Sequence, residues 1–431
     1  MPASAAPFPA PPASLGPSAV GAYDRRRWPR GEQAEVADAA RRAEDQRPGR
    51  DRWRMGVEAR ALVLVTAGLL AFGLAVLYSA SAILAVQEGR GSAHYLIRQL
   101  TGVAAGTVVF MVAAKIDAER WRRWAWPIMA LAMGAMLLTV LPFTKGIAPP
   151  IHGSRRFLLG GSIQPSEFAK LAVIVWTSML LVKKQELGLM RRLTKGLLPF
   201  LFVVGPLALL AALEPDLSVA MTFVLIMGII LFAGGVRIGH FIALGVMAVP
   251  VLWHEIERLN YVLQRLLGFL GTADARAEVN YQLKQSLLAV GSGGWLGVGF
   301  GEGRQQYGFL PFPYSDFIGS NVGEEWGFVG LVGLTLAFAL YGWLGFRIAR
   351  QAPTRFQQLL AVGLTTTLVL TAYLHVGVVI GLLPTTGLTL PFISYGRSNL
   401  VLSLLMTGVL VNIGSERQRV VGEDATNPLA A

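Results

Sequence analysis

Residues 280–330 read NYQLKQSLLAVGSGGWLGVGFGEGRQQYGFLPFPYSDFIGSNVGEEWGFVG, and long apolar runs lie on both sides of them. The stretch is rich in glycine, and its charged residues include Lys284, Arg304, Asp316, Glu324 and Glu325. Apolar sequence resumes directly after Asp316, which places that carboxylate at the end of an expected membrane helix. Ionisable groups near membrane depth are costly and usually functional. The stretch therefore predicts a catalytic loop over a groove buried in the membrane.

Composition assigns the chain to the polytopic membrane proteins. Hydrophobic residues make up 53% of the chain and charged residues 15%, whereas a soluble domain averages roughly 25% charged. The apolar residues cluster into runs of about 20, the length that crosses a bilayer core. The net charge of +12 does not indicate nucleic-acid binding, because the basic residues collect in the N-terminal tail and in alternate loops. The absence of cysteine excludes disulfides, a thiolate nucleophile and a cysteine metal site.

Ten apolar runs define the expected membrane domain. They are residues 60–80, 97–115, 124–143, 165–182, 197–213, 217–233, 240–253, 318–346, 358–382 and 398–414. With the N-terminus in the cytoplasm, each cytoplasmic loop carries lysine or arginine, as the positive-inside rule requires. The sequence thus predicts an all-α polytopic membrane protein of about ten transmembrane helices, with a large extracytoplasmic catalytic loop, residues 254–317, between helices 7 and 8.

The flanking segments are polar. Residues 1–57 predict a disordered, basic cytoplasmic tail, and residues 416–431 a cytoplasmic C-terminal tail. The membrane domain occupies residues 58–415. Residues 253–270 have apolar side chains at helical spacing with charges between them, which predicts an amphipathic helix at the outer interface.

The fourth run opens with a charged pair. Pro165 suits the first helical position, and Glu167 suits the positively polarised first turn. Glu167 and Lys170 are three residues apart, so they share a helix face and can pair. The pair is either a local ion pair that offsets the cost of both charges or part of a substrate site.

Further polar groups gather at the expected outer face. Arg155 and Arg156 suit phosphate oxygens, or they snorkel to lipid headgroups. Glu214 and Asp216 flank a proline; they hold a cation, pair with these arginines, or form a solvated turn. Segment 291–303 lacks the lysine of a P-loop, so a re-entrant or closely packed loop is the better interpretation.

The last outer loop, residues 383–396, is broken by proline and glycine and supplies hydroxyls that include Ser394. Arg397 opens the next helix, whose N-terminus is a natural anion site. His375 lies within a span and has no second ligand at helical spacing, so it is interpreted as a satisfied core residue.

At these motifs the chain resembles the SEDS family (shape, elongation, division and sporulation), polytopic glycosyltransferases that polymerise peptidoglycan. The resemblance covers about residues 60–415, and the matching segments are Gln164–Ala172, Glu214–Leu217, Tyr281–Gly301, Leu310–Gly330 and Leu383–Gly396. The wording of the last segment is closer to the division branch than to the elongation branch. The chain departs from the family at Phe312, where glutamate is usual, at Ser315, where threonine is usual, and at Arg397.

The resemblance implies that lipid II is both donor and acceptor. A sugar hydroxyl would attack the donor's anomeric carbon with inversion, and undecaprenyl pyrophosphate would leave. Asp316 is the expected base. The expected substrate-binding residues are Arg155, Arg156, Glu167, Lys170, Lys284, Arg304, Ser394 and Arg397. Positive charge for the pyrophosphate comes from this set or from a divalent cation, and no metal ligand is assigned.

The resemblance also implies the setting. The expected location is the bacterial inner membrane at the division septum, with both termini cytoplasmic and the active site outside. The expected partners are a class B penicillin-binding protein transpeptidase, other divisome proteins and membrane lipids. A lipid II flippase, the elongation paralogue with the same chemistry, and an inactive scaffold are the alternatives. The charges crowd the outer side, which favours surface chemistry over transport.

Overall fold

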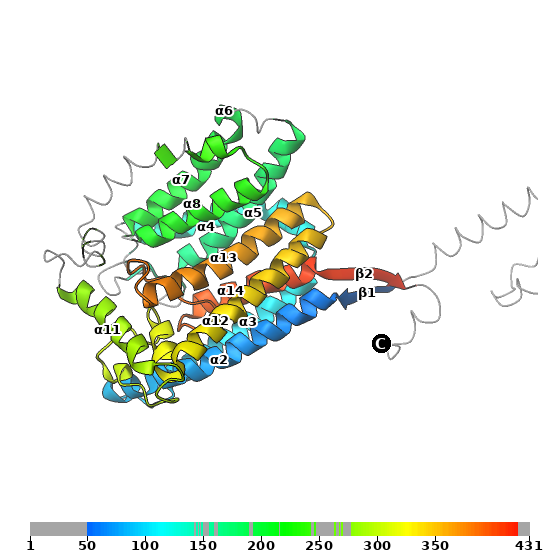
Figure 1. Cartoon of the computed structure of the whole chain (residues 1–431). Helices are drawn as coiled ribbons and strands as arrows, with labels where there is room; N and C mark the ends of the chain where they lie inside the picture. The colour runs from blue at the N-terminus through cyan, green and yellow to red at the C-terminus, as the bar shows by residue number, and fades with distance from the viewer. Residues whose placement is uncertain are drawn as a thin grey trace, which may run out of the picture. The chain divides into compact units, whose positions relative to one another are not determined.

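The computed structural model describes residues 50–141, 144, 146, 148–149, 155–158, 163–188, 193–214, 216–242, 245–246, 263, 267, 269 and 277–420 (Figure 1). Its principal helices are α2 (Val57–Gln87), α3 (His94–Lys115), α4 (Ala118–Val140), α5 (Pro165–Glu186), α6 (Leu193–Gly196), α7 (Leu198–Leu213), α8 (Leu217–Ala233), α11 (Ala277–Gly293), α12 (Ile318–Gln351), α13 (Arg355–Val379) and α14 (Arg397–Ile413). A short 3-10 helix, η5 (Gln305–Tyr307), follows α11.

Within these residues, six helices are long and apolar enough to cross a membrane: α2, α3, α4, α5, α12 and α13. The apolar helices α7, α8 and α14 are shorter, at 16, 17 and 17 residues. Nine of the ten expected runs are therefore helical. The seventh, 240–253, and the amphipathic segment 253–270 lie mostly outside the described residues. Helix α11 lies inside the stretch expected as the outer loop, 254–317.

The helices of the membrane domain pack in two groups that α13 joins (Figure 1). One group contains α2, α3, α12 and α14, with α14 along α3 and α12 along α2. The other contains α4, α5, α7 and α8. Helix α5 touches α4, α8, α13 and α14, and 89% of its apolar window is buried. The charged pair that opens α5 is consequently placed inside the protein.

Two strands were not expected from the sequence. β1 (Arg50–Met55) falls in the stretch predicted to be a disordered tail, and it pairs with β2 (Ser415–Val420) in a two-stranded sheet. The β1 sequence RDRWRM alternates arginine with other residues, which is a strand period rather than a helical one.

Helix α12 is broken at Gly327, whose φ of 65° and ψ of −159° are not helical. In an unbroken helix the amides of residues 328 and 329 would donate to the carbonyls of residues 324 and 325. Segment 294–299 bonds all four groups instead. Its bonds are Phe328 N to Gly294 O (2.9 Å), Val329 N to Trp295 O (3.1 Å), Val298 N to Glu324 O (3.0 Å) and Gly299 N to Glu325 O (3.1 Å). The glycine-rich loop therefore completes the helix at its break.

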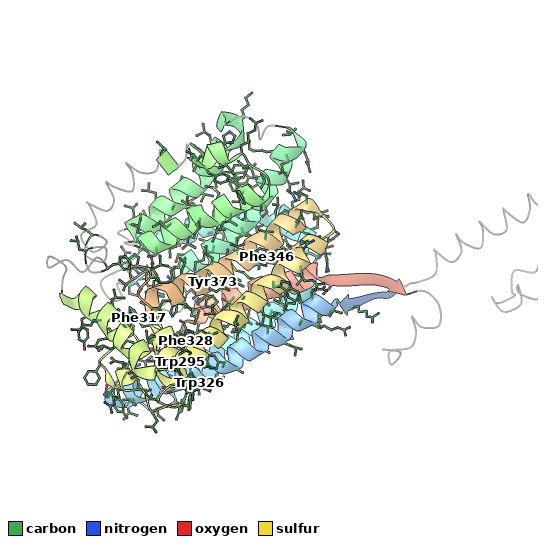
Figure 2. All side chains as sticks on the ribbon, viewed as in Figure 1. Trp295, Phe317, Trp326, Phe328, Phe346 and Tyr373 are labelled. Atoms are coloured by element: carbon green, nitrogen blue, oxygen red, sulfur yellow. The ribbon has the colours of Figure 1, made fainter. Side chains whose placement is uncertain are left out.

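The close approach explains why residue 297 of this loop is glycine. A Cβ on Gly297 would overlap the carbonyl of Glu325, and the φ of Gly297 is +85°. Trp295, Trp326 and Phe328 gather around the contact (Figure 2), and the rings of Trp295 and Phe328 lie 5.1 Å apart. The predicted closely packed loop is confirmed, because main chain meets main chain here.

Gly297→Ala should destabilise the protein by about 2–4 kcal/mol, from left-handed strain and the overlap with α12. Gly333→Ala is the matched control in α12, because nothing lies near its Cβ position, and it should be neutral or stabilising by roughly 1 kcal/mol. Thermal unfolding in detergent measures both. Equal stability of the two variants would show that the loop does not depend on this contact.

Candidate functional site

Asp316 lies directly before α12, and its side chain is half-buried. The N-cap position of α12 is Phe317, so Asp316 lies one residue outside the cap. A Cβ built on Gly387 would lie 3.6 Å from the Asp316 Oδ2 atom, and the φ of Gly387 is +73°. The loop of residues 383–396 therefore lies against the Asp316 carboxylate, which brings two separate sequence motifs together.

Two tethers fix the backbone next to Asp316. The Ser394 hydroxyl accepts a hydrogen bond from Leu390 N (2.8 Å) and donates one to Ser315 O (2.7 Å). Tyr395 N donates to Tyr314 O (2.9 Å). In the structure the Ser394 hydroxyl holds the loop beside Asp316. Its expected role in substrate binding stays a prediction.

A group of three tyrosines packs beside these tethers. The ring centroids of Tyr95 and Tyr314 are 4.8 Å apart, those of Tyr95 and Tyr395 are 5.2 Å apart, and those of Tyr314 and Tyr395 are 5.6 Å apart. The Tyr95 hydroxyl hydrogen-bonds to the Glu88 carboxylate at 2.9 and 3.0 Å. Burial raises the pKa of Tyr314, so its hydroxyl remains protonated. This tyrosine group was not predicted from the sequence, although Tyr314 precedes the motif residue Ser315 and Tyr395 follows the motif residue Ser394.

His375 is a satisfied core residue, as predicted. Its Nδ1 atom lies 2.8 Å from Leu388 O, and its Nε2 atom accepts a hydrogen bond from Gly319 N at 3.2 Å. The ring therefore joins the first turn of α12 to the loop of residues 383–396. The sequence alone does not reveal this second role, because it requires three segments to meet.

The N-termini of α5 and α14 meet at the same end of the bundle. Gln164 N donates to the Ser398 hydroxyl at 3.0 Å. Arg397, the first residue of α14, is half-buried, and its Cγ would lie 3.1 Å from a Cβ on Gly102. The start of α14 follows directly from the loop that holds Asp316, so Arg397 belongs to the same end of the protein.

The predicted ion pair of α5 is confirmed. Lys170 Nζ lies 2.7 Å from Glu167 Oε1, and each residue is 4% exposed. The second carboxylate oxygen, Glu167 Oε2, is buried, as is the Ser166 hydroxyl, and neither makes a hydrogen bond within the described residues. The substrate role of this pair stays a prediction.

Arg156 binds the Glu214–Leu217 motif through one main-chain carbonyl and one carboxylate. Its Nε donates to the Glu214 carbonyl at 3.1 Å, and its Nη1 lies 3.3 Å from Asp216 Oδ2. Glu214 itself is buried, and burial raises its pKa to about 8 despite a hydrogen bond from Thr139. The predicted pairing is therefore confirmed for Arg156. The interpretation as a solvated turn is wrong, because α4 covers the Glu214 side chain.

Arg155 has a different environment. Its Nε donates to Ala148 O (3.1 Å) and its Nη2 to the Thr144 hydroxyl (3.0 Å), both of which are neutral.

The motif that contains Asp216 also reaches the loop of residues 383–396, because the Ser218 hydroxyl donates to Thr386 O at 2.8 Å. This loop is therefore the point where the motifs converge.

Lys284 and Arg304 are exposed, on α11 and just before η5. The tethers described above that fix the backbone next to Asp316 come from other residues, and the substrate role of Lys284 and Arg304 stays a prediction. The Arg304 amide instead donates to Glu324 Oε1 at 2.8 Å, which holds the loop on α12. Phe312 stands where the family usually has glutamate, and its φ is 53°.

Comparisons with known proteins agree with one another. The family model of the FtsW, RodA and SpoVE cell cycle proteins matches residues 60–419. A probable peptidoglycan glycosyltransferase FtsW of Trichlorobacter lovleyi is 36% identical over 84% of this chain and 95% of its own length. The stage V sporulation protein E of Bacillus subtilis is 35% identical over 82% of this chain and 95% of its own length.

Two solved structures share the fold. One comes from work on polymerization and crosslinking by a peptidoglycan synthase complex; its TM-score is 0.63, with 24% identity over 82% of this chain and 96% of that chain. The other is the rod shape determining protein RodA of Thermus thermophilus, with a TM-score of 0.56 and 24% identity over 82% of this chain and 95% of that chain.

Replacing Glu167 or Lys170 singly with alanine should cost about 3–5 kcal/mol of stability, because each change leaves a buried charge unpaired. The exchanged pair, Glu167→Lys with Lys170→Glu, should recover part of the loss. Lys183→Ala is the control, because Lys183 is an exposed lysine of the same helix. Unfolding in detergent gives the double-mutant cycle, and a coupling near zero would contradict the pairing.

Proposed function

The chain belongs to the family of the FtsW, RodA and SpoVE cell cycle proteins, and on that premise we propose that it is a peptidoglycan glycosyltransferase that polymerises lipid II during cell division. The observation that carries the chemistry is the position of Asp316, held between the start of α12 and the loop of residues 383–396. The resemblance of the motifs to the polymerases of this family supports the same substrate.

The proposed reaction forms one glycosidic bond. The 4-hydroxyl of the acceptor's terminal sugar attacks the anomeric carbon of the donor's linked sugar, that centre inverts, and undecaprenyl pyrophosphate departs. The hydroxyl proton passes to a base, which must lie within about 2.6–3.2 Å. Asp316 is that base. A single carboxylate suffices, because pyrophosphate leaves as a stable anion, and this is compatible with Phe312 in place of a second acid.

The leaving pyrophosphate requires positive charge. Lys170 and Arg156 are each paired with a carboxylate. The hydrogen-bond partners of Arg155 are neutral, so no carboxylate among them offsets its positive charge. Arg397 adds its charge at the N-terminus of α14, where the helix dipole also favours anions. The described residues contain no group of three acidic or histidine side chains. A divalent cation would therefore be held mainly by pyrophosphate oxygens and water, as magnesium usually is.

The distribution of buried charge favours polymerisation over transport. The buried carboxylates and ammonium of the described residues all lie near the Asp316 end of the bundle: Glu167, Lys170, Glu214, Glu324 and Glu325. A flippase would need polar groups along a path through the membrane. We therefore place the reaction at the outer surface, with both termini in the cytoplasm.

We further propose that the protein acts at the division septum with a class B penicillin-binding protein and other divisome proteins. A neighbour of the same fold from a peptidoglycan synthase complex supports a transpeptidase partner. The exposed aromatic side chains Trp295, Phe300 and Tyr307, at 74%, 50% and 54% exposure, offer apolar surface at the Asp316 end.

Asp316→Asn should lower the rate of glycan polymerisation by about 10²- to 10⁴-fold, because asparagine keeps the size but cannot accept the proton. Folding and lipid II binding should be unchanged. Asp316→Glu should also be impaired, since a displacement of about 1 Å can cost roughly 10²-fold. Polymer formed from labelled lipid II by the purified protein with its transpeptidase partner is the readout.

Glu302→Gln is the matched control for this test, because Glu302 is an exposed carboxylate of the same outer segment. It should polymerise at the wild-type rate. Near-normal activity of Asp316→Asn would remove the base assignment and reopen the flippase and scaffold alternatives.

Membrane orientation can be tested with single thiols, because the chain contains no cysteine. Glu302→Cys should react with a membrane-impermeant maleimide in intact spheroplasts. Arg123→Cys, an exposed position at the opposite end, should react only after the membrane is opened. The reverse pattern would place Asp316 on the cytoplasmic side and contradict the proposed polymerase.

A further inference from the structure

A cavity of about 250 Å³ lies at the end of the bundle opposite Asp316. The end of α8, the last turns of α12 and the first turns of α13 form its walls, with Phe346, Arg350 and Arg355 among the lining residues. Asp316 precedes the first residue of α12 and Arg350 is in its last turn, so the two sites are separated by the length of that helix. Phe317 and Phe346 mark the two ends in Figure 2.

The described lining of the cavity is positively charged. Among the residues that the structure describes, it includes two arginines and no aspartate or glutamate. Arg350 is exposed, and it makes no hydrogen bond or ion pair within the described residues. The nearby Arg347, in contrast, pairs with Glu58 at 2.9 Å and lies over the Trp343 ring. Two guanidinium groups without a carboxylate point to an anionic ligand.

Arg355 is held in place for such a ligand. One of its nitrogens donates to Gln358 Oε1 and another to the Ala233 carbonyl at the end of α8. A guanidinium has five N–H donors, so these two bonds leave about three for an incoming oxyanion. The fixed fork geometry of arginine suits phosphate oxygens.

Apart from the two arginines and Gln358, the lining is apolar, as a lipid requires and a soluble phosphate does not. Phe346, Ala349, Leu359 and Val362 face the cavity. Above it, α12 exposes a stripe of large apolar side chains at helical spacing: Leu336, Leu340 and Trp343, at 62%, 45% and 54% exposure. From residue 336 to residue 346 the helix rises about 15 Å, a length that can carry much of an acyl chain.

We propose that this cavity binds the headgroup of an anionic phospholipid, with the phosphate between Arg350 and Arg355 and an acyl chain along the α12 stripe. A water molecule occupies about 30 Å³, so the cavity has room for a group the size of glycerol phosphate. Basic pockets between membrane helices are known to select such headgroups. The site is separate from the proposed polymerase centre.

The test uses the purified full-length protein in detergent and photoreactive phosphatidylglycerol, with photoreactive phosphatidylcholine of the same chains as the neutral probe. Mass spectrometry locates the labelled peptides. Phosphatidylglycerol should label residues 346–362, and phosphatidylcholine should do so weakly. Arg350→Gln with Arg355→Gln should reduce the labelling about tenfold, the loss expected for charge-assisted hydrogen bonds.

Arg123→Gln is the matched control, because Arg123 is an exposed arginine at the same end but outside the cavity; it should label normally. Arg350→Gln alone guards against misfolding, since Arg350 has no internal bond to lose, and it should still reduce labelling severalfold. Equal labelling by both lipids, equal loss in Arg123→Gln, or no loss in Arg350→Gln would overturn the proposal. Displacement by glycerol 3-phosphate as effective as by unlabelled phosphatidylglycerol would also overturn it, in favour of a site for soluble phosphate.

Discussion

The structure depends on the way that the break in α12 is satisfied. Interrupting a helix inside an apolar body exposes amides and carbonyls that water cannot reach, and each unsatisfied group is costly. Here the four groups released at Gly327 all bond to main-chain atoms of segment 294–299. The glycine-rich loop thus supplies the hydrogen bonds that an unbroken α12 would make within itself. Because it is bonded to α12 on one side and continues from α11 on the other, it fixes α11 to α12.

The first turn of α12 is held by contacts from several other segments. The Ser320 hydroxyl lies 2.8 Å from that of Ser286 on α11, and Asn321 donates to Pro313 O at 3.2 Å. His375 adds its bond to Gly319 N. Asp316 lies directly before this turn. Because the residues of the turn are held by these hydrogen bonds, the position of the Asp316 backbone is held as well. If Asp316 is the base, as proposed, its position is set before substrate arrives, and such a base needs less reorganisation during the reaction.

Features that depend on local spacing could be predicted from the sequence, whereas contacts between segments far apart in the chain could not. The apolar runs, the Glu167–Lys170 pair and the packed glycine loop follow from spacing and residue type, because a helix or a turn decides them. The pairing of Arg156 with Asp216 was one of several open alternatives, since loop charges have no fixed period. The tyrosine group and the role of Ser394 were missed, because they arise only when α3, the start of α12 and the loop of residues 383–396 come together. Helix α11 was missed within a stretch whose glycines suggested a loop throughout.

The main-chain contact at Gly297 also affects how variation among relatives should be interpreted. Exposed loops usually tolerate substitution, so an unchanging loop residue is commonly taken as a sign of chemistry. In this loop the carbonyl of Glu325 occupies the space that a side chain on residue 297 would need. A glycine retained there through evolution would report the shape of α12 and carry no information about substrate. Inference of catalytic positions from invariance must therefore separate Gly297, which is constrained by geometry, from the loop's carboxylates and cations, whose side chains are not constrained by this contact.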